Sequence, residues 1–308
     1  MPDPPDANPR RPAFEGPWAD PTRSVAPLAI WPQLGDVELR QHFVQAGPVR
    51  TRVLEAGDGP PLVLMHGTGG HVEAYMRNLA SLARDFRVIT FDFVGHGYSD
   101  GPDIPYTLDV YARQLGDLLD ALGIERARLS GESLGGWVTA WFSAQRPERV
   151  ERAVLSVPGN VRAKPETMKA LREGTRRAVL VVSPETVRAR LEWLFAPDNR
   201  HLVTDELVQI RYQIYRRPQA RRTIENVLAL QDQEIRKHYT WTPEWCGRID
   251  VPTLILWTEH DPTGPVEEGE LLNGWIPGSK LEVMAGAGHW PQWERPTEFD
   301  RIHREFLT

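Results

Sequence analysis

One stretch of the chain, residues 129–137, constrains the fold more than any other. Its sequence is Leu-Ser-Gly-Glu-Ser-Leu-Gly-Gly-Trp, which contains the pattern Gly-x-Ser-x-Gly. Before it, residues 126–130 alternate polar and apolar side chains as a strand does. After it, residues 134–145 have a helical pattern that ends before Pro147. The stretch therefore predicts a tight turn that leads from a buried strand directly into a helix.

Ser133 is expected at the tip of this turn. The backbone doubles back on itself there, so Gly131 and Gly135 are needed where a side chain would collide with the chain. This geometry, called a nucleophile elbow, exposes the serine hydroxyl and places the N–H groups of a helix N-terminus beside it. A glycine-rich turn without a catalytic role is the alternative, because a pattern of five residues arises by chance in many proteins.

Strand and helix patterns alternate along most of the chain. The alternation predicts an α/β fold in which a mostly parallel sheet is flanked by helices on both faces. The first two strands are expected to form a hairpin around Gly47-Pro48. Further along the chain, Asp109 is expected to cap the N-terminus of the helix at 110–122. We expect strands at residues 37–45, 49–55, 62–65, 87–92, 126–130, 150–157, 251–258 and 280–284, and helices at 72–83, 110–122, 134–145, 267–275 and 297–307.

Residues 1–35 contain nine prolines. At this density proline prevents helix formation and strand pairing, so we interpret the segment as a Pro-rich N-terminal arm. Trp18 and Trp31 favour partial docking of the arm on the surface or on a neighbouring subunit. A disordered tail is the alternative.

Residues 159–247 have helical patterns and almost no strand patterns, with helices expected at 166–176, 184–194, 204–215 and 219–231. The segment holds 16 Lys and Arg residues against 11 Asp and Glu. A basic helical insertion that covers a more acidic rest of the chain would attract an anionic substrate beneath a lid. Solvent-exposed helix faces are an equally good explanation for most of these arginines. We therefore expect three parts: the arm 1–35, an α/β core 36–158 and 248–308, and a helical lid 159–247.

Composition excludes several classes of protein. The hydrophobic content of 41% and charged content of 25% are ordinary for a soluble globular chain. The net charge of −6 argues against nucleic acid as a partner. We find no apolar run long enough for a membrane span and no signal peptide, and expect a cytoplasmic protein. The single cysteine, Cys246, excludes an internal disulfide and is expected to be a small buried side chain.

A catalytic serine needs a base that takes its proton and a carboxylate that orients the base. Asp261 and His289 each follow a predicted strand, and with Ser133 they stand in the chain order Ser, Asp, His that the elbow predicts. We therefore predict a catalytic triad of Ser133, Asp261 and His289. His66 and His96 lie in glycine turns, where a structural hydrogen bond is the expected role. No histidine pair has the spacing of a metal-binding helix, and no metal or other cofactor is expected.

Attack on a carbonyl creates an oxyanion that needs N–H donors. The expected donors are the backbone N–H groups of Leu134, directly after the nucleophile, and of Thr68, in the loop after strand 62–65. This loop is glycine-rich and follows the carboxyl end of a strand, where ligands bind in open α/β sheets. Gly67 and Gly69 are therefore expected to border the substrate.

From residue 37 to the end, the chain resembles α/β-hydrolases. Within that superfamily it is similar to meta-cleavage product hydrolases, which cleave carbon-carbon bonds of vinylogous diketones formed in aromatic degradation. The resemblance is carried by residues 288–295, Gly-His-Trp-Pro-Gln-Trp-Glu-Arg, by Glu298-Phe299, and by residues 203–212. It implies that Arg211 binds the substrate carboxylate, that Trp290 lies beside the catalytic histidine, and that the substrate is a 2-hydroxy-6-oxo-dienoate.

The chain departs from this family at two places. The loop His66–His71 is shorter than the family's glycine-rich run, and Glu132 precedes the serine where many members have asparagine. A carboxylate at this position can pair with Arg211 and leave less positive charge for the substrate. Glu132 is still expected among the substrate-binding residues.

Several functions stay open from the sequence alone. The first is hydrolysis of a carbon-carbon bond in a small, anionic and hydrophobic substrate, and the second is a carboxylesterase or lactonase that forms an acyl-enzyme. A ligand-binding protein or a cofactor-free dioxygenase on the same scaffold is the third. Dehalogenases and epoxide hydrolases are disfavoured, because they need an aspartate where Ser133 stands. A homodimer is a possible assembly.

Overall fold

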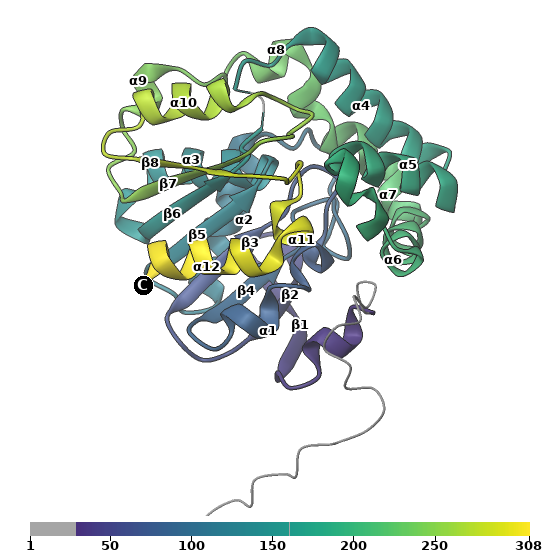
Figure 1. Ribbon diagram of the computed structural model, residues 1–308, viewed down its shortest axis with the longest axis horizontal. Helices are drawn as coiled ribbons and strands as arrows, with labels where there is room; N and C mark the ends of the chain where they lie inside the picture. Colours follow the sequence, from purple (N-terminus) through teal and green to yellow (C-terminus); the bar gives the residue numbers. More distant parts are fainter. Residues whose placement is uncertain (1–28, 160) are drawn as a thin grey trace, which may run out of the picture.

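The computed structural model describes residues 29–159 and 161–308. Its strands are β1 (Leu39–Ala46), β2 (Val49–Ala56), β3 (Pro61–Met65), β4 (Arg87–Phe91), β5 (Ala127–Glu132), β6 (Val150–Ser156), β7 (Thr253–Thr258) and β8 (Lys280–Met284). They form one sheet in the order β1-β2-β4-β3-β5-β6-β7-β8 (Figure 1). β2 is antiparallel to both of its neighbours, and the strands from β4 across to β8 are parallel.

Helices cover both faces of this sheet. α12 (Pro296–Leu307) crosses in front of the strands in Figure 1, while α2 (Leu108–Ala121) and α3 (Leu134–Gln145) lie behind them. α12 buries Phe299, Ile302 and Leu307, which recur at helical spacing on its inner face. The structure thus has the predicted α/β fold, with a mostly parallel sheet between helical layers.

The helix expected over residues 72–83 is wrong, because the segment breaks in the middle. A 3₁₀ turn, Val72–Tyr75, and the short helix α1, Leu79–Leu82, stand in its place. The N–H of Val72 donates to Asp92 Oδ1 (2.8 Å) at the first turn. At the break, the side chain of Asn78 donates to Asp300 Oδ1 (2.9 Å), 222 residues away. These tertiary hydrogen bonds replace a continuous helical ladder.

Asp109 does not cap α2, contrary to expectation. Thr107 holds the N-cap position, and Asp109 lies within the first turn. Its carboxylate accepts hydrogen bonds from Trp141 Nε1 (2.9 Å) and the Tyr239 hydroxyl (3.0 Å). The residue therefore joins α2 to neighbouring elements instead of closing the helix end.

Helices fill the chain between β6 and β7. They are α4 (Pro165–Leu180), α5 (Pro184–Leu194), α6 (Asp205–Tyr215), α7 (Pro218–Val227), α8 (Gln233–Arg236) and α9 (Pro243–Cys246). Proline opens several of them at the first position, where its missing N–H costs no hydrogen bond. Figure 1 shows α4 to α7 gathered on one side of the sheet. The helix expected at 219–231 ends at Val227, and a separate 3₁₀ turn follows.

The remaining helices are α10 (Val266–Trp275) and α11 (Pro291–Glu294). Cys246, at the end of α9, is fully buried, as the sequence predicted. Burial raises the pKa of its thiol to about 12, so it behaves as a small apolar side chain. Within residues 29–159 and 161–308, no helix is both long and apolar enough to cross a bilayer.

The end of the N-terminal arm packs on the helical insertion. Ile30 and Leu34 are buried, and the N–H of Ile30 donates to Glu206 Oε2 (2.8 Å) in α6. Trp31 is 72% exposed, so this tryptophan does not dock on the chain. The predicted docking of Trp18 lies outside the described residues.

Candidate active site

Ser133 stands at the turn between β5 and α3 with a backbone φ of +55°. This is a conformation that L-residues rarely adopt, and it aims the side chain away from the sheet. A Cβ atom on Gly131 would lie 2.1 Å from the Gly135 carbonyl group, and one on Gly135 would lie 2.1 Å from the Met65 carbonyl oxygen. Only glycine fits at both places, so the turn is the nucleophile elbow that the sequence predicted.

His289 and Asp261 meet beyond the carboxyl ends of β8 and β7. Nδ1 of His289 lies 2.9 and 3.0 Å from the two carboxylate oxygens of Asp261. The carboxylate is held in turn by the N–H of Thr263, which donates to Oδ1 (2.8 Å). The N–H of His289 donates to the carbonyl of Leu194 (2.7 Å), which ties this loop to the end of α5. The structure therefore brings two of the three predicted triad residues into contact.

The other nitrogen of His289 faces Glu132. Its Nε2 lies 3.3 Å from Glu132 Oε1, while Glu132 Oε2 accepts the Gly67 N–H (2.8 Å). Among the described residues, the hydroxyl of Ser133 makes no hydrogen bond to His289. The side of the imidazole that a serine base needs is thus occupied by a carboxylate.

The charges around His289 favour binding of a proton by the pair formed by His289 and Glu132. Burial by itself lowers the pKa of His289, but the Asp261 and Glu132 carboxylates outweigh it, so this pKa is raised. Burial also raises the pKa of Glu132, against the opposing effects of His289, the Gly67 N–H group and Arg211. With both pKa values raised, Glu132 and His289 hold one proton between them more readily than either group would in water.

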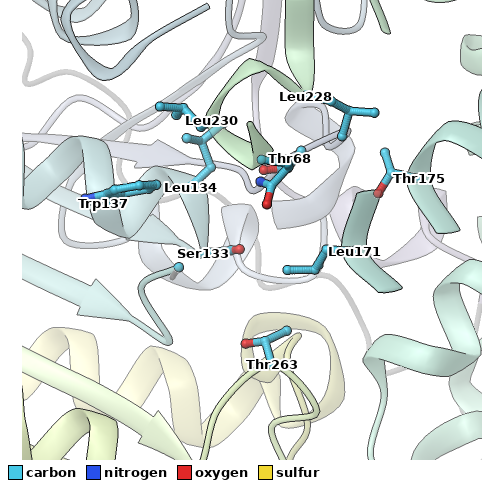
Figure 2. A pocket seen from close by; sticks show the side chains of 11 residues that line it. Thr68, Ser133, Leu134, Trp137, Leu171, Thr175, Leu228, Leu230 and Thr263 are labelled. Atoms are coloured by element: carbon cyan, nitrogen blue, oxygen red, sulfur yellow. The ribbon is translucent and has the colours of Figure 1, made fainter. Parts of the chain in front are cut away.

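A small cavity lies above Ser133 (Figure 2). Thr68, Leu134 and Thr263 line it together with Ser133, so both predicted oxyanion donors belong to residues around the serine. The cavity volume is about 20 Å³, enough for a water molecule but far below the several hundred Å³ of a typical ligand site. The space beside Ser133 is therefore too small, as it stands, for a substrate.

The glycines of the loop after β3 fit between functional side chains. A Cβ on Gly67 would lie 2.7 Å from Glu132 Oε2 and 3.0 Å from Ser133 Cβ. One on Gly69 would lie 2.9 Å from the Tyr215 hydroxyl, and Gly69 also has a positive φ. Gly67 therefore lies beside two predicted site residues, and a larger residue at either glycine position would collide with its neighbours.

Arg211 is buried beside Trp290. Its guanidinium carbon lies 4.7 Å from the centre of the Trp290 ring, and Nη1 donates to the Tyr215 hydroxyl (3.3 Å). Tyr215 in turn donates to the Gly69 carbonyl (2.7 Å). Nε and Nη2 of Arg211 have no partner within the described structure. The expected competition by Glu132 is not seen, since no ion pair joins the two side chains in this part of the chain.

Arg190 in α5 is a buried charge that the sequence analysis did not single out. It is 6% exposed and lies on the same helix face as the buried residues Val187, Leu191 and Leu194. An arginine at an apolar position of an amphipathic helix is the signal that could have identified it. Burial lowers its pKa to about 10, so the side chain keeps its charge at neutral pH.

His66 and His96 have structural roles, as predicted. Phe93 N–H donates to His66 Nε2 (3.1 Å), so the protonated Nδ1 of His66 donates to the Gly67 carbonyl (2.8 Å). Nδ1 of His96 lies 3.0 Å from the Val94 carbonyl. Burial lowers the pKa of His66 well below its usual value and that of His96 to about 4, so both rings are neutral. Within residues 29–159 and 161–308, no three His, Cys, Asp or Glu side chains form a metal-binding group.

Comparison with known proteins identifies the family. Residues 60–296 match the family model described as the alpha/beta hydrolase fold. The chain belongs to this family. Its elbow serine and the paired His289 and Asp261 occupy the strand ends where α/β-hydrolases carry their catalytic groups.

Several related α/β-hydrolases have named activities. The chain is 32% identical over 275 residues to 2-hydroxymuconate semialdehyde hydrolase of Pseudomonas sp. (strain CF600), with 88% of this chain and 94% of that protein covered. It is 33% identical over 280 residues to 2-hydroxy-6-oxo-2,4-heptadienoate hydrolase of Pseudomonas putida, with 86% and 95% covered. The solved structure of 2-hydroxy-6-oxo-6-phenylhexa-2,4-dienoate hydrolase from Rhodococcus sp. strain RHA1 matches with a TM-score of 0.77 and 25% identity, over 88% of this chain and 99% of that one.

Proposed function

We propose that this α/β-hydrolase cleaves the carbon-carbon bond of a 2-hydroxy-6-oxo-dienoate through Ser133, His289 and Asp261. The observation that carries the proposal is that one edge of the Arg211 guanidinium, formed by Nε and Nη2, has no hydrogen-bond acceptor among the described residues. Both nitrogens are buried, in a site that also contains His289 and Trp290. A carboxylate matches such an edge with two parallel hydrogen bonds. The relatives named after dienoate substrates support the same choice of substrate.

In this mechanism Asp261 keeps the proton of His289 on Nδ1, so that Nε2 can act as the base. His289 assists conversion of the dienol into its keto form and then activates the hydroxyl of Ser133 or a water molecule for attack on the ketone. The N–H groups of Leu134 and Thr68 stabilise the oxyanion. When the oxyanion collapses, the carbon-carbon bond breaks and its electron pair passes to the dienoate fragment, which takes up a proton. Attack by water releases the other fragment as a carboxylic acid directly, whereas attack by Ser133 leaves an acyl-enzyme that a water molecule, activated by His289, then hydrolyses to that acid.

The helices between β6 and β7 act as a lid in this proposal, covering a core formed by residues 36–158 and 248–308. Their opening admits the substrate, because the closed cavity beside Ser133 has only about 20 Å³. Their closure then excludes water from the reacting groups. The substrate displaces Glu132 from Nε2 of His289 and so frees the base.

A carboxylesterase or lactonase is the second candidate. Glu132 favours it, because a carboxylate in the site repels an acidic substrate and a neutral ester avoids this repulsion. The same triad would then form an acyl-enzyme on Ser133.

A substrate panel separates the two proposals. Initial rates are measured for 2-hydroxy-6-oxo-6-phenylhexa-2,4-dienoate, for nitrophenyl esters and for lactones, with wild type and Arg211→Met. The carbon-carbon hydrolase turns over the dienoate fastest and loses about 100-fold in kcat/KM with Arg211→Met, while neutral esters lose far less. Faster ester than dienoate turnover, with an acyl adduct on Ser133, would favour the esterase.

A further inference from the structure

Arg190 is a 6% exposed guanidinium that makes no hydrogen bond or ion pair with any described residue. Its Nη1 is fully enclosed, and the Glu132 carboxylate acts on the charge only from beyond ion-pair distance. Its guanidinium carbon lies 4.9 Å from the centre of the Trp193 ring, which offers weak cation–π attraction only. A buried and unpaired charge is strongly unfavourable. Such a residue therefore indicates a place where a ligand supplies the missing anion.

The position of Arg190 links it to the site around Ser133. Its Cδ lies 3.5 Å from where a Cβ of Gly174 would stand, in the middle of α4. The next residue, Thr175, lines the cavity beside Ser133 and has a buried hydroxyl without a partner. The positive charge of Arg190 also opposes protonation of His289. Arg190 thus acts on the same site from the lid side.

A carboxylate bound to Arg211 does not supply the anion that Arg190 lacks. One carboxylate fits the open Nε and Nη2 edge of Arg211 in a two-bond pair. Once this edge is filled, the donors of Arg190 are still without an acceptor. The two guanidiniums also repel each other, since Arg211 contributes to lowering the pKa of Arg190. A second negative group would relieve this repulsion.

Space for a longer ligand exists next to Arg190. A groove of about 500 Å³ lies between α4 and α5, where two arginines, Arg177 and Arg190, face one carboxylate, that of Glu185. The other residues that line it are Ala170, Gly174, Thr186, Ala189 and Trp193. The small residues leave a gap between the helices, and Arg190 stands between this groove and the residues around Ser133.

We propose that Arg190 and Arg211 bind two acidic groups of one substrate, so that the site takes a diacid. Arg211 holds the carboxylate of the dienoate, and Arg190 holds an acidic group at the far end of the acyl portion, on the side of the groove. This inference rests on the proposed function, because it specifies the substrate class of the same site.

Calorimetric titration tests the proposal without turnover. Ser133→Ala is titrated with hexanoate and with the dicarboxylates succinate, adipate and suberate. At least one dicarboxylate is expected to bind about tenfold or more tightly than hexanoate. Adding Arg190→Met removes this preference, whereas adding Arg177→Met, which changes an exposed arginine of the same groove, leaves it in place.

Two results would overturn the proposal. Equal affinities for hexanoate and every dicarboxylate would show that no second acidic group is bound. Equal weakening of hexanoate and dicarboxylates by Arg190→Met would mean that both arginines share one carboxylate, or that Arg190 is structural. The melting temperature separates these last two cases, because removal of an unpaired buried charge raises it and loss of a structural residue lowers it.

The proposed function is tested separately. Wild-type turnover of a monoacidic dienoate does not depend on the assignment of Arg190. If the wild type cleaves no dienoate, the proposed function fails, and the titrations with Ser133→Ala still decide whether the site takes a diacid.

Discussion

Glu132 Oε1 lies 3.3 Å from Nε2 of His289, on the opposite side of the ring from Asp261. The imidazole therefore stands between two buried carboxylates. In a serine hydrolase this nitrogen must accept the proton of the nucleophile. In the proposed mechanism, Glu132 competes with Ser133 for this nitrogen in the substrate-free protein and stabilises the protonated form of His289, which cannot act as a base.

Replacement of Glu132 by glutamine should shift the pH dependence of catalysis. Glu132 contributes to the raised pKa of His289, so its neutral substitute lowers that pKa. The acidic limb of kcat/KM reports protonation of the base in the free enzyme, and we expect it to move to lower pH in Glu132→Gln. A pH profile of kcat/KM measures the shift.

A suitable control is Glu55→Gln, which removes another buried carboxylate whose side chain pairs with His42 and Arg87 instead of facing His289. In this variant the acidic limb of kcat/KM should lie at the same pH as in the wild type. An unmoved limb in Glu132→Gln, or a shift to higher pH, would mean that Glu132 does not hold the proton on His289.

The elbow should store backbone strain that glycine relieves. Ser133 has a φ of +55° and a ψ of −113°, and non-glycine residues in such regions cost on the order of 1–3 kcal/mol. We expect Ser133→Gly to be more stable than Ser133→Ala by about 1 kcal/mol, although both variants lack the nucleophile. Urea denaturation of the two variants compares them. Equal stabilities, or a more stable alanine variant, would argue against strain at the elbow.

Asp300 should make the fold less stable as the pH rises. It is 2% exposed in α12, and burial raises its pKa to about 7 despite the hydrogen bond from Asn78. The folded chain therefore keeps this proton at pH values where the unfolded chain, with an ordinary aspartate pKa of 3.8, has lost it. The stabilising contribution is complete below the unfolded pKa and is lost as the pH rises through about 7.

Asp300→Asn removes this titration. Between pH 5 and 8, the wild type should lose about 2–3 kcal/mol more stability than the variant, measured by thermal denaturation at each pH. Glu305→Gln, on the exposed face of the same helix, should follow the wild type. The assignment fails if Asp300→Asn and the wild type show the same change with pH.

Local signals in the sequence were sufficient for much of the fold. The helix at 134–145 and the strand at 280–284 have the expected bounds, because small residues, periodicity and a closing proline or glycine all agree there. The contact between His289 and Asp261 was also predictable, since the carboxyl ends of parallel strands lie at one edge of the sheet. The break in the helix expected at residues 72–83 was not predictable, because the hydrogen bond from Asn78 goes to Asp300, which is far away in the chain.

Side-chain partners within the site could not be derived from the sequence. The sequence left open a pairing of Glu132 with Arg211, whereas in the structure the Gly67 N–H group fixes the Glu132 carboxylate against His289. Arg190 was overlooked because its burial depends on how α5 packs against α4 and α6. These contacts arise from tertiary packing, which periodicity and spacing do not specify.

The most direct test of the account is the reaction of Ser133→Ala with 2-hydroxy-6-oxo-6-phenylhexa-2,4-dienoate, followed by stopped-flow loss of dienoate absorbance beside the wild type. If Ser133 is the residue that His289 activates, the wild type cleaves the substrate and the variant is slower by a factor of about 10³ or more, with its fold and ligand binding retained. Cleavage by Ser133→Ala within tenfold of the wild-type rate would contradict the account.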